Sequence, residues 1–158
     1  MLYGKYKFLC VFNDDAILPY YKGSTFRGVF GRALKKVVCA LRRSDCSECL
    51  LRHKCVYSRV FETHSSYNET KDTRIAAPPH PFVIEPPPTT ETHFSNGDHF
   101  DFHLLLFGQT NEYLPYFIYA FEQMGKIGIG KRINGKRAHF NLEGVTTVSY
   151  THLRAHET

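Results

Sequence analysis

The sequence predicts an α+β domain, because segments with strand periodicity alternate along the chain with two segments of helical periodicity. Apolar and polar residues alternate in the strand segments, whereas apolar residues recur every three or four positions in the helical ones. The predicted elements are, in order, a strand Lys5–Phe12, a helix 24–41, an extended segment Pro81–Glu85, a strand Asp98–Phe107, a helix 114–125 and a strand Ala138–Val148. This βαββαβ order is the split βαβ pattern of a ferredoxin-like domain.

The two predicted helices have end signals of different kinds. Ser24 or Thr25 can cap the first helix, whose apolar residues form a continuous stripe. Pro115 suits the first turn of the second helix, because a missing backbone N–H costs nothing there, and Gly125 is expected to end it. The intervening segment 63–92 is rich in Pro, Thr and Ser and is expected to be mostly irregular.

The composition is that of a globular protein. Of the 158 residues, 42% are hydrophobic and 15% are aromatic, which excludes a disordered chain. No apolar run is long enough to span a bilayer, and polar residues interrupt Met1–Lys7 before the apolar part of a signal peptide can form. We therefore expect a cytoplasmic protein with no membrane partner, in a compartment where cysteines are seldom paired as disulfides.

Four cysteines within one short loop are the most specific signal in the sequence. They have the spacing C-x6-C-x2-C-x5-C and are Cys39, Cys46, Cys49 and Cys55. Four thiolates at loop distance can close the tetrahedral shell of one metal ion, so we expect a metal-binding insertion at 39–55 with a structural Zn²⁺; an iron–sulfur cluster is the alternative. The remaining interpretation is four unpaired thiols in a small core. Cys10, in the first strand, is expected to be an ordinary core residue.

The positive charge is concentrated in two windows that contain no acidic residue. The net charge is only +5, yet the segment 22–43 has seven of the 20 Lys and Arg side chains and the segment 125–138 has five. Such clusters attract phosphate groups, and Gly28 and Gly31 keep the basic face of the first helix low enough for a nucleic-acid backbone to approach. A solvated surface is the other interpretation. The candidate contact residues are Arg27, Arg32, Lys35, Lys36, Lys126, Lys131, Arg132, Lys136 and Arg137.

The glycine-rich segment 125–137, GKIGIGKRINGKR, does not match the standard nucleotide-binding loops. A dinucleotide fingerprint needs a third glycine and a preceding strand, whereas this segment follows a predicted helix. A Walker loop needs Lys-Ser or Lys-Thr after the glycines, which this segment lacks. The remaining functional interpretation is a loop whose backbone N–H groups, including those of Gly128 and Gly130, cradle phosphate among basic side chains. An ordinary connection is the alternative.

Several of these segments support a comparison with a known family. The segment Leu18–Leu34, LPYYKGSTFRGVFGRAL, resembles the first-helix signature of CRISPR-associated RAMP proteins. Cys46–Tyr57 resembles the cysteine-bearing insertion of one branch of them, the endoribonucleases that process CRISPR repeat RNA. Three later segments resemble the rest of that branch, and with them the likeness covers nearly all of the segment 5–148: Phe107–Gly108, Tyr113–Pro115 and Gly125–Gly130.

The resemblance implies a RAMP-type domain that binds CRISPR repeat RNA and cleaves it in precursor transcripts. In such enzymes the 2′-hydroxyl attacks the adjacent phosphate and leaves a 2′,3′-cyclic phosphate, with no metal ion at the scissile bond and no small-molecule cofactor. Members often have a histidine base in or just before the first helix, but the segment 13–41 contains no histidine. The candidate catalytic residues are therefore Tyr20, Tyr21, Lys22 and His53.

Two other functions are open. The chain can be a non-catalytic RAMP subunit that holds CRISPR RNA in an effector complex, together with other CRISPR-associated subunits. It can also be a zinc-stabilised RNA-binding module that is unrelated to CRISPR. Cleavage of a repeat RNA distinguishes the enzyme from the non-catalytic subunit.

The last ten residues call for separate treatment. The segment Ser149–Thr158, SYTHLRAHET, resembles the translated read-through of a sequencing adapter. We therefore expect the ferredoxin-like domain to occupy residues 1–148, the segment 149–158 to be non-native, and a second RAMP domain to follow in the native protein.

The four-cysteine loop generates a prediction about metal content. Elemental analysis of purified protein should find about one equivalent of zinc per chain, because a loop with so few apolar residues needs the ion in order to fold. Replacing Cys46 and Cys49 with Ser should remove the metal, whereas Cys10→Ala should leave the metal content unchanged. Metal-free protein with an ordered cysteine loop would contradict the prediction.

Overall fold

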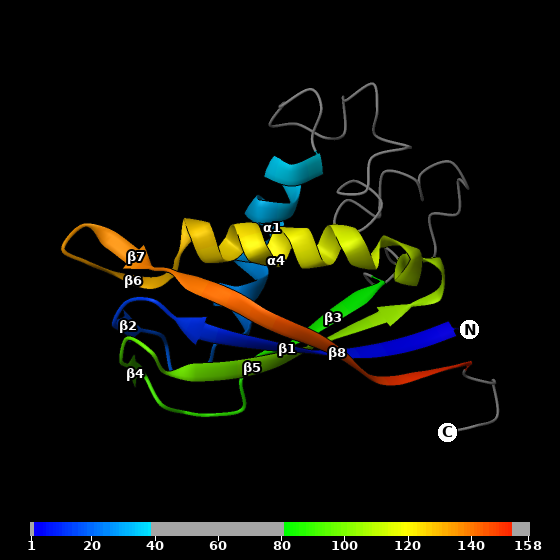
Figure 1. The fold of residues 1–158 in the computed structure, drawn as a ribbon, viewed down its shortest axis with the longest axis horizontal. Coiled ribbons are helices and arrows are strands. Elements are labelled where there is room, and N and C mark those ends of the chain that lie inside the picture. Colours follow the sequence, from blue (N-terminus) through cyan, green and yellow to red (C-terminus); the bar gives the residue numbers. More distant parts are fainter. Residues whose placement is uncertain (1, 39–80, 153–158) are drawn as a thin grey trace, which may run out of the picture.

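Four antiparallel strands form one sheet in the order β3-β5-β1-β8 (Figure 1). The computed structural model describes residues 2–38 and 81–152. The strands of the sheet are β1 (Leu2–Phe12), β3 (Phe82–Glu85), β5 (His99–Phe107) and β8 (Phe140–His152). Two helices, α1 (Gly23–Val38) and α4 (Leu114–Ile127), pack against each other and cover one face of this sheet.

The predicted order of the main elements is confirmed in the described residues, where β1, α1, β3, β5, α4 and β8 follow one another along the chain. In the sheet, β1 lies between β5 and β8, as a ferredoxin-like domain requires of its first strand. The register places Phe8 opposite Phe102 and Cys10 opposite Phe100, so alternate residues of both strands point toward the helices. None of the helices in the described ranges is long and apolar enough to cross a membrane.

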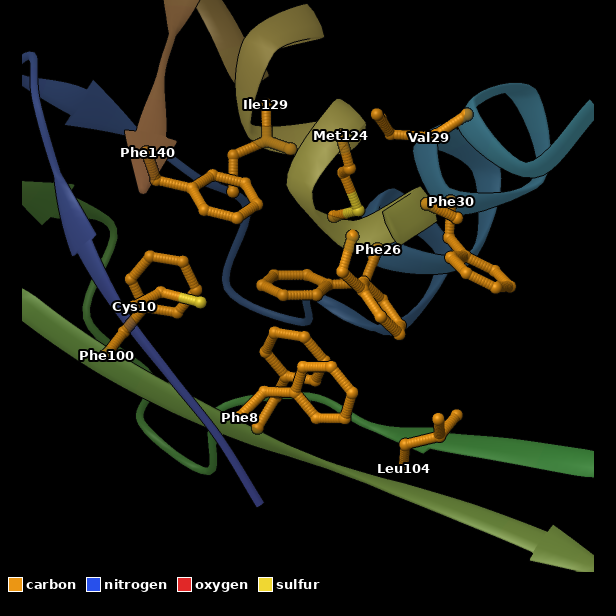
Figure 2. Close-up of a cluster of buried hydrophobic side chains, with 14 of the residues drawn as sticks. Phe8, Cys10, Phe26, Val29, Phe30, Phe100, Leu104, Met124, Ile129 and Phe140 are labelled. Carbon is orange, nitrogen blue, oxygen red and sulfur yellow. The ribbon is translucent and has the colours of Figure 1, made fainter. Parts of the chain in front are cut away.

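Phenylalanine rings hold the helices to the sheet (Figure 2). The ring of Phe121 on α4 lies 4.8 Å from that of Phe8 on β1 and 4.5 Å from that of Phe30 on α1, measured between centroids. Phe8 also stacks on Phe102 of β5 at 5.0 Å. Aromatic pairs at such separations contribute about 0.5–1.5 kcal/mol each beyond the area that they bury, so this cluster fixes how α1 and α4 lie on the sheet.

The end of α4 differs from the prediction. Gly125 does not end the helix; it is buried within it, and a Cβ there would clash with the carbonyl oxygen of Phe140. The helix continues to Ile127 and ends at Gly128, whose φ of 91° is in the region that favours glycine. Gly125 therefore allows α4 to approach β8 closely, a role that helical periodicity alone does not reveal.

The segment expected to be a glycine-rich loop is mostly a β-hairpin. Its strands are β6 (Ile129–Ile133) and β7 (Lys136–Ala138). Asn134 and Gly135 connect them with φ values of 53° and 81°, as a two-residue Asn-Gly hairpin turn requires. The prediction of a loop was therefore wrong over most of this segment, and the Asn-Gly pair is the sequence signal for the hairpin that the prediction did not use.

Strand β8 extends beyond the predicted boundary. It pairs with β1 as far as His152, and so it includes the residues 149–152 of the segment that was expected to be non-native. Two short strands that the periodicity missed, β2 (Ala16–Ile17) and β4 (His93–Phe94), pair with each other. Runs of two residues are too short to produce a periodic signal.

Burial of Cys10 generates a prediction about pH. Burial raises the pKa of this thiol to about 12, and the charges of Glu143 and Asp101 add to the shift. In the unfolded chain the thiol ionises near its ordinary value of 9.0, so unfolding releases a proton in the pH range between the two values. Because the unfolded state then binds fewer protons, the free energy of unfolding should fall as the pH rises above about 9. Urea unfolding should show a smaller decline in Cys10→Ala, and equal slopes in the two proteins would contradict the prediction.

Candidate nucleic-acid interface

A cleft of about 500 Å³ opens between α1, β2 and the β6–β7 hairpin. The hairpin projects at one end of the molecule, where β2 also lies (Figure 1). The volume is within the range of about 300–1,000 Å³ that is usual for ligand sites. The residues that line the cleft are Ile17, Leu18, Pro19, Ser24, Thr25, Gly28, Val29, Arg32, Gly130, Lys131 and Arg137.

Helix α1 contributes one wall of the cleft. Ser24, Gly28 and Arg32 are spaced by four residues and therefore share a face, which is opposite to the face of Phe30 in the core. A Cβ added at Gly28 would meet no atom within 4 Å, so the wall is open at this point. The expectation of a low, basic helix face holds for Gly28 but is wrong for Gly31, which is buried.

The hairpin contributes the opposite wall through a close backbone approach. Gly130 has a φ of 85°, and a Cβ there would clash with the carbonyl oxygen of Ile17. Only glycine allows this backbone to lie so close to β2, and the contact brings the exposed Lys131 to the edge of the cleft. The glycine thus acts through packing, and it brings together cations that are far apart in the sequence.

Arg137 lines the cleft and has a hydrogen-bond donor that is buried and, within the described residues, unpaired. Its Nε atom is buried and has no hydrogen-bond partner among residues 2–38 and 81–152. Arg137 also lines a second hollow of about 490 Å³ on the side of Asp14 and Asp15. A buried donor without a partner costs about 1–3 kcal/mol, so the placement of this guanidinium beside the cleft is unfavourable in itself and is maintained by the surrounding packing.

Several of the predicted contact residues lie outside the cleft lining. Arg27 is on another face of α1, where its guanidinium lies 4.8 Å from the ring centroid of Phe82. The backbone N–H of Gly128 donates to the carbonyl oxygen of Met124 at 2.9 Å, so it is not available to cradle phosphate. The remaining basic candidates do not line the cleft either: Lys35 and Lys36 follow Arg32 on α1, Arg132 and Lys136 are on the hairpin, and Lys126 is in the last turn of α4.

Lys22 does not present its charge to a ligand, contrary to the catalytic expectation. The residue is only 1% exposed, and its ammonium donates hydrogen bonds to the carbonyl oxygens of Tyr20 at 3.2 Å and Thr89 at 2.9 Å. Burial lowers the pKa of Lys22, and the carboxylate of Glu91 opposes that shift. The ammonium therefore fixes the loop before α1, while Tyr20 and Tyr21 are each 70% exposed on it.

The predicted metal ligands and one catalytic candidate cannot be placed. Cys39, Cys46, Cys49, Cys55 and His53 lie outside the described residues. Within residues 2–38 and 81–152, no three His, Cys, Asp or Glu side chains form a group that could hold a metal ion. Zinc in the cysteine loop stays a prediction.

The open face of the sheet is a second candidate surface, because some other four-stranded domains bind RNA on this face through aromatic side chains. Here the middle of β1 and β5 has an ion pair instead, with Lys7 Nζ 3.2 Å from an oxygen of Asp101. Among residues 2–38 and 81–152, the aromatic side chains that meet on this face are at one end of it, where the ring centroids of Tyr3 and Phe107 lie 5.7 Å apart. In the described part of the chain, the centre of this face therefore has an ion pair where a stacking platform would be, and the cleft is the better candidate.

The chain belongs to the family whose model is described as AF_1859_N, N-terminal domain, which matches residues 1–157. A relative from Archaeoglobus fulgidus, named only as an uncharacterized protein, is 30% identical over 112 residues. That alignment covers 71% of this chain but 37% of the relative, so the matched region is little more than a third of the relative's length.

A solved structure has the same fold. A chain in the crystal structure of the Csm3-Csm4 subcomplex of the type III-A CRISPR-Cas interference complex matches with a TM-score of 0.54 and 15% identity. The match covers 92% of this chain and 78% of that one. The chain therefore shares the fold of that chain, which agrees with the fold that the resemblance of the first-helix segment implied, and at 15% identity the likeness shows the fold alone.

Proposed function

We propose that this chain is a component of a CRISPR complex that holds CRISPR RNA in the cleft between α1, β2 and the β6–β7 hairpin. The observation that carries the proposal is the convergence of Arg32, Lys131 and Arg137, from two acid-free segments of the sequence, on one open cleft. The RAMP-type fold and the resemblance of the first helix to CRISPR-associated proteins support this ligand. Other CRISPR-associated subunits are then the expected protein partners.

The chemistry of the cleft suits an RNA backbone. Arg presents a planar fork of donors that can bind phosphate oxygens in pairs, and Lys adds a compact charge. The hydroxyls of Ser24 and Thr25, at the first turn of α1, add neutral donors on the same wall. Three phosphate contacts on single-stranded RNA correspond to a slope of about −2 in log affinity against log salt concentration.

Removal of two exposed cations should test the proposal. Replacing Arg32 and Lys131 with Gln should weaken the binding of a repeat RNA at low salt and reduce the steepness of its salt dependence by roughly 1.4, because two phosphate contacts are lost. Fluorescence anisotropy over a series of salt concentrations measures both quantities. Lys7→Gln removes one cation from the open sheet face and should leave the slope unchanged.

A glutamate placed in the cleft, with a matched glutamate outside it, distinguishes RNA binding in the cleft from a general attraction of RNA to the positive charge of the protein. Gly28→Glu adds a carboxylate where no atom lies within 4 Å, and Gly144→Glu adds the same group in equally open space on β8. Only Gly28→Glu should abolish RNA binding. Equal losses in the two variants, or a loss confined to Lys7→Gln, would place the RNA elsewhere.

A second candidate function is cleavage of the bound repeat RNA to a 2′,3′-cyclic phosphate. The observation that favours it is the exposure of Tyr20 and Tyr21 on the loop between two cleft-lining segments. A tyrosine is a poor base at neutral pH, because its ordinary pKa is about 10, and the ammonium of Lys22 is engaged with backbone carbonyls. Cleavage by this route would therefore be slow.

Incubation with a repeat RNA distinguishes the two candidates. If the protein cleaves, replacing Tyr20 and Tyr21 with Phe should abolish the cyclic-phosphate product and leave RNA affinity unchanged, because only the hydroxyl groups are lost. Mass spectrometry of the product ends identifies the cyclic phosphate. Tight binding by the wild-type protein without any cleavage would support the holding function.

A further inference from the structure

The loop before α1 exposes two consecutive aromatic rings beside the basic cleft. Tyr20 and Tyr21 are each 70% exposed, more than any other large apolar side chain in the described residues. Pro19 on one side of the pair and Ser24 on the other both line the cleft. A ligand that occupies the cleft therefore has two aromatic side chains directly at its border.

The backbone that bears these rings is firmly held. The buried ammonium of Lys22 donates to the carbonyl oxygen of Tyr20 and also to that of Thr89, which lies 67 residues after the lysine in the sequence. Just before the pair, the N–H of Leu18 donates to the carbonyl oxygen of Thr92 at 2.8 Å. Because the loop is tied to one neighbouring segment at both points, the exposed rings project from a backbone that is already ordered, which lowers the entropic cost of binding.

The ring of Tyr21 lies over Gly23. A Cβ added at Gly23 would lie 2.5 Å from the hydroxyl oxygen of Tyr21 and 2.7 Å from the adjacent ring carbon. The outer edge of the ring thus lies over the first residue of α1, next to the cleft wall that begins at Ser24. Glycine leaves the space that this ring position needs.

We propose that Tyr20 and Tyr21 form a stacking platform for unpaired RNA bases, while Arg32, Lys131 and Arg137 hold the backbone in the adjacent cleft. This inference rests on the proposed function and specifies its ligand as single-stranded RNA. Bases of a duplex are stacked on each other and are not available to a side-chain platform. Stacking tolerates any base, so the platform contributes affinity without reading sequence.

Two probes of equal length test the platform: a single-stranded RNA and an abasic ribose-phosphate chain. Wild-type protein should bind the RNA about tenfold or more tightly than the abasic chain, because stacking on a side chain is worth about 1–3 kcal/mol per base. The double variant Tyr20→Ala/Tyr21→Ala should lose this preference and bind the abasic chain as before. The double variant Tyr20→Phe/Tyr21→Phe should keep the preference, because the rings remain.

The control is an equal removal of exposed aromatic rings on another element. Tyr116 and Tyr119 on α4 are 46% and 51% exposed, and replacing both with Ala should leave the preference for RNA intact. The platform would be overturned if the Ala variant at positions 20 and 21 kept the preference, or if the Phe variant lost it. Equal binding of the two probes by wild-type protein would also overturn the platform, but the cleft would remain the proposed RNA site. Binding of neither probe would overturn the proposed function itself.

Discussion

Packing of phenylalanine rings between two helices and one sheet is the constraint on which the rest of the structure depends. Phe26 and Phe30 direct one face of α1 into the core, so the opposite face, with Ser24, Gly28 and Arg32, is left at the surface. Since the rings fix the rotation of α1 about its axis, they also decide which residues of the helix can form a wall of the cleft. The cleft is thus a consequence of how the core is packed.

Two glycines then allow elements to approach more closely than side chains would permit. Gly125 brings α4 against β8, and Gly130 brings the hairpin against β2. The second approach gathers Arg32, Lys131 and Arg137 around one cleft, although about a hundred residues separate the first from the others. Like charges that are gathered in this way repel one another in the free protein, and a bound phosphate backbone relieves that repulsion.

Within the described residues, the loop before α1 fits the proposed holding of RNA better than the alternative proposal of cleavage. A cleaving site needs a base that can be ionised near neutral pH and cations that are free to stabilise the developing charge. A phenol is a poor general base near neutral pH, and the ammonium nearest to the two tyrosines along the chain, that of Lys22, is bound to two carbonyl oxygens. What the loop offers instead is ring surface on an ordered backbone, beside a cleft that suits phosphate.

The sequence by itself determined the order of the main elements, because alternation in β1 and β5 and the apolar stripe of α1 are local patterns that survive folding. It also identified the basic segments and the aromatic residues before α1. Tertiary structure alone decided that Gly125 is a contact with β8, that Lys22 is buried, and that Arg32 and Arg137 line the same cleft. These outcomes depend on which distant backbone each residue meets, and a residue's type and neighbours in sequence do not contain that information.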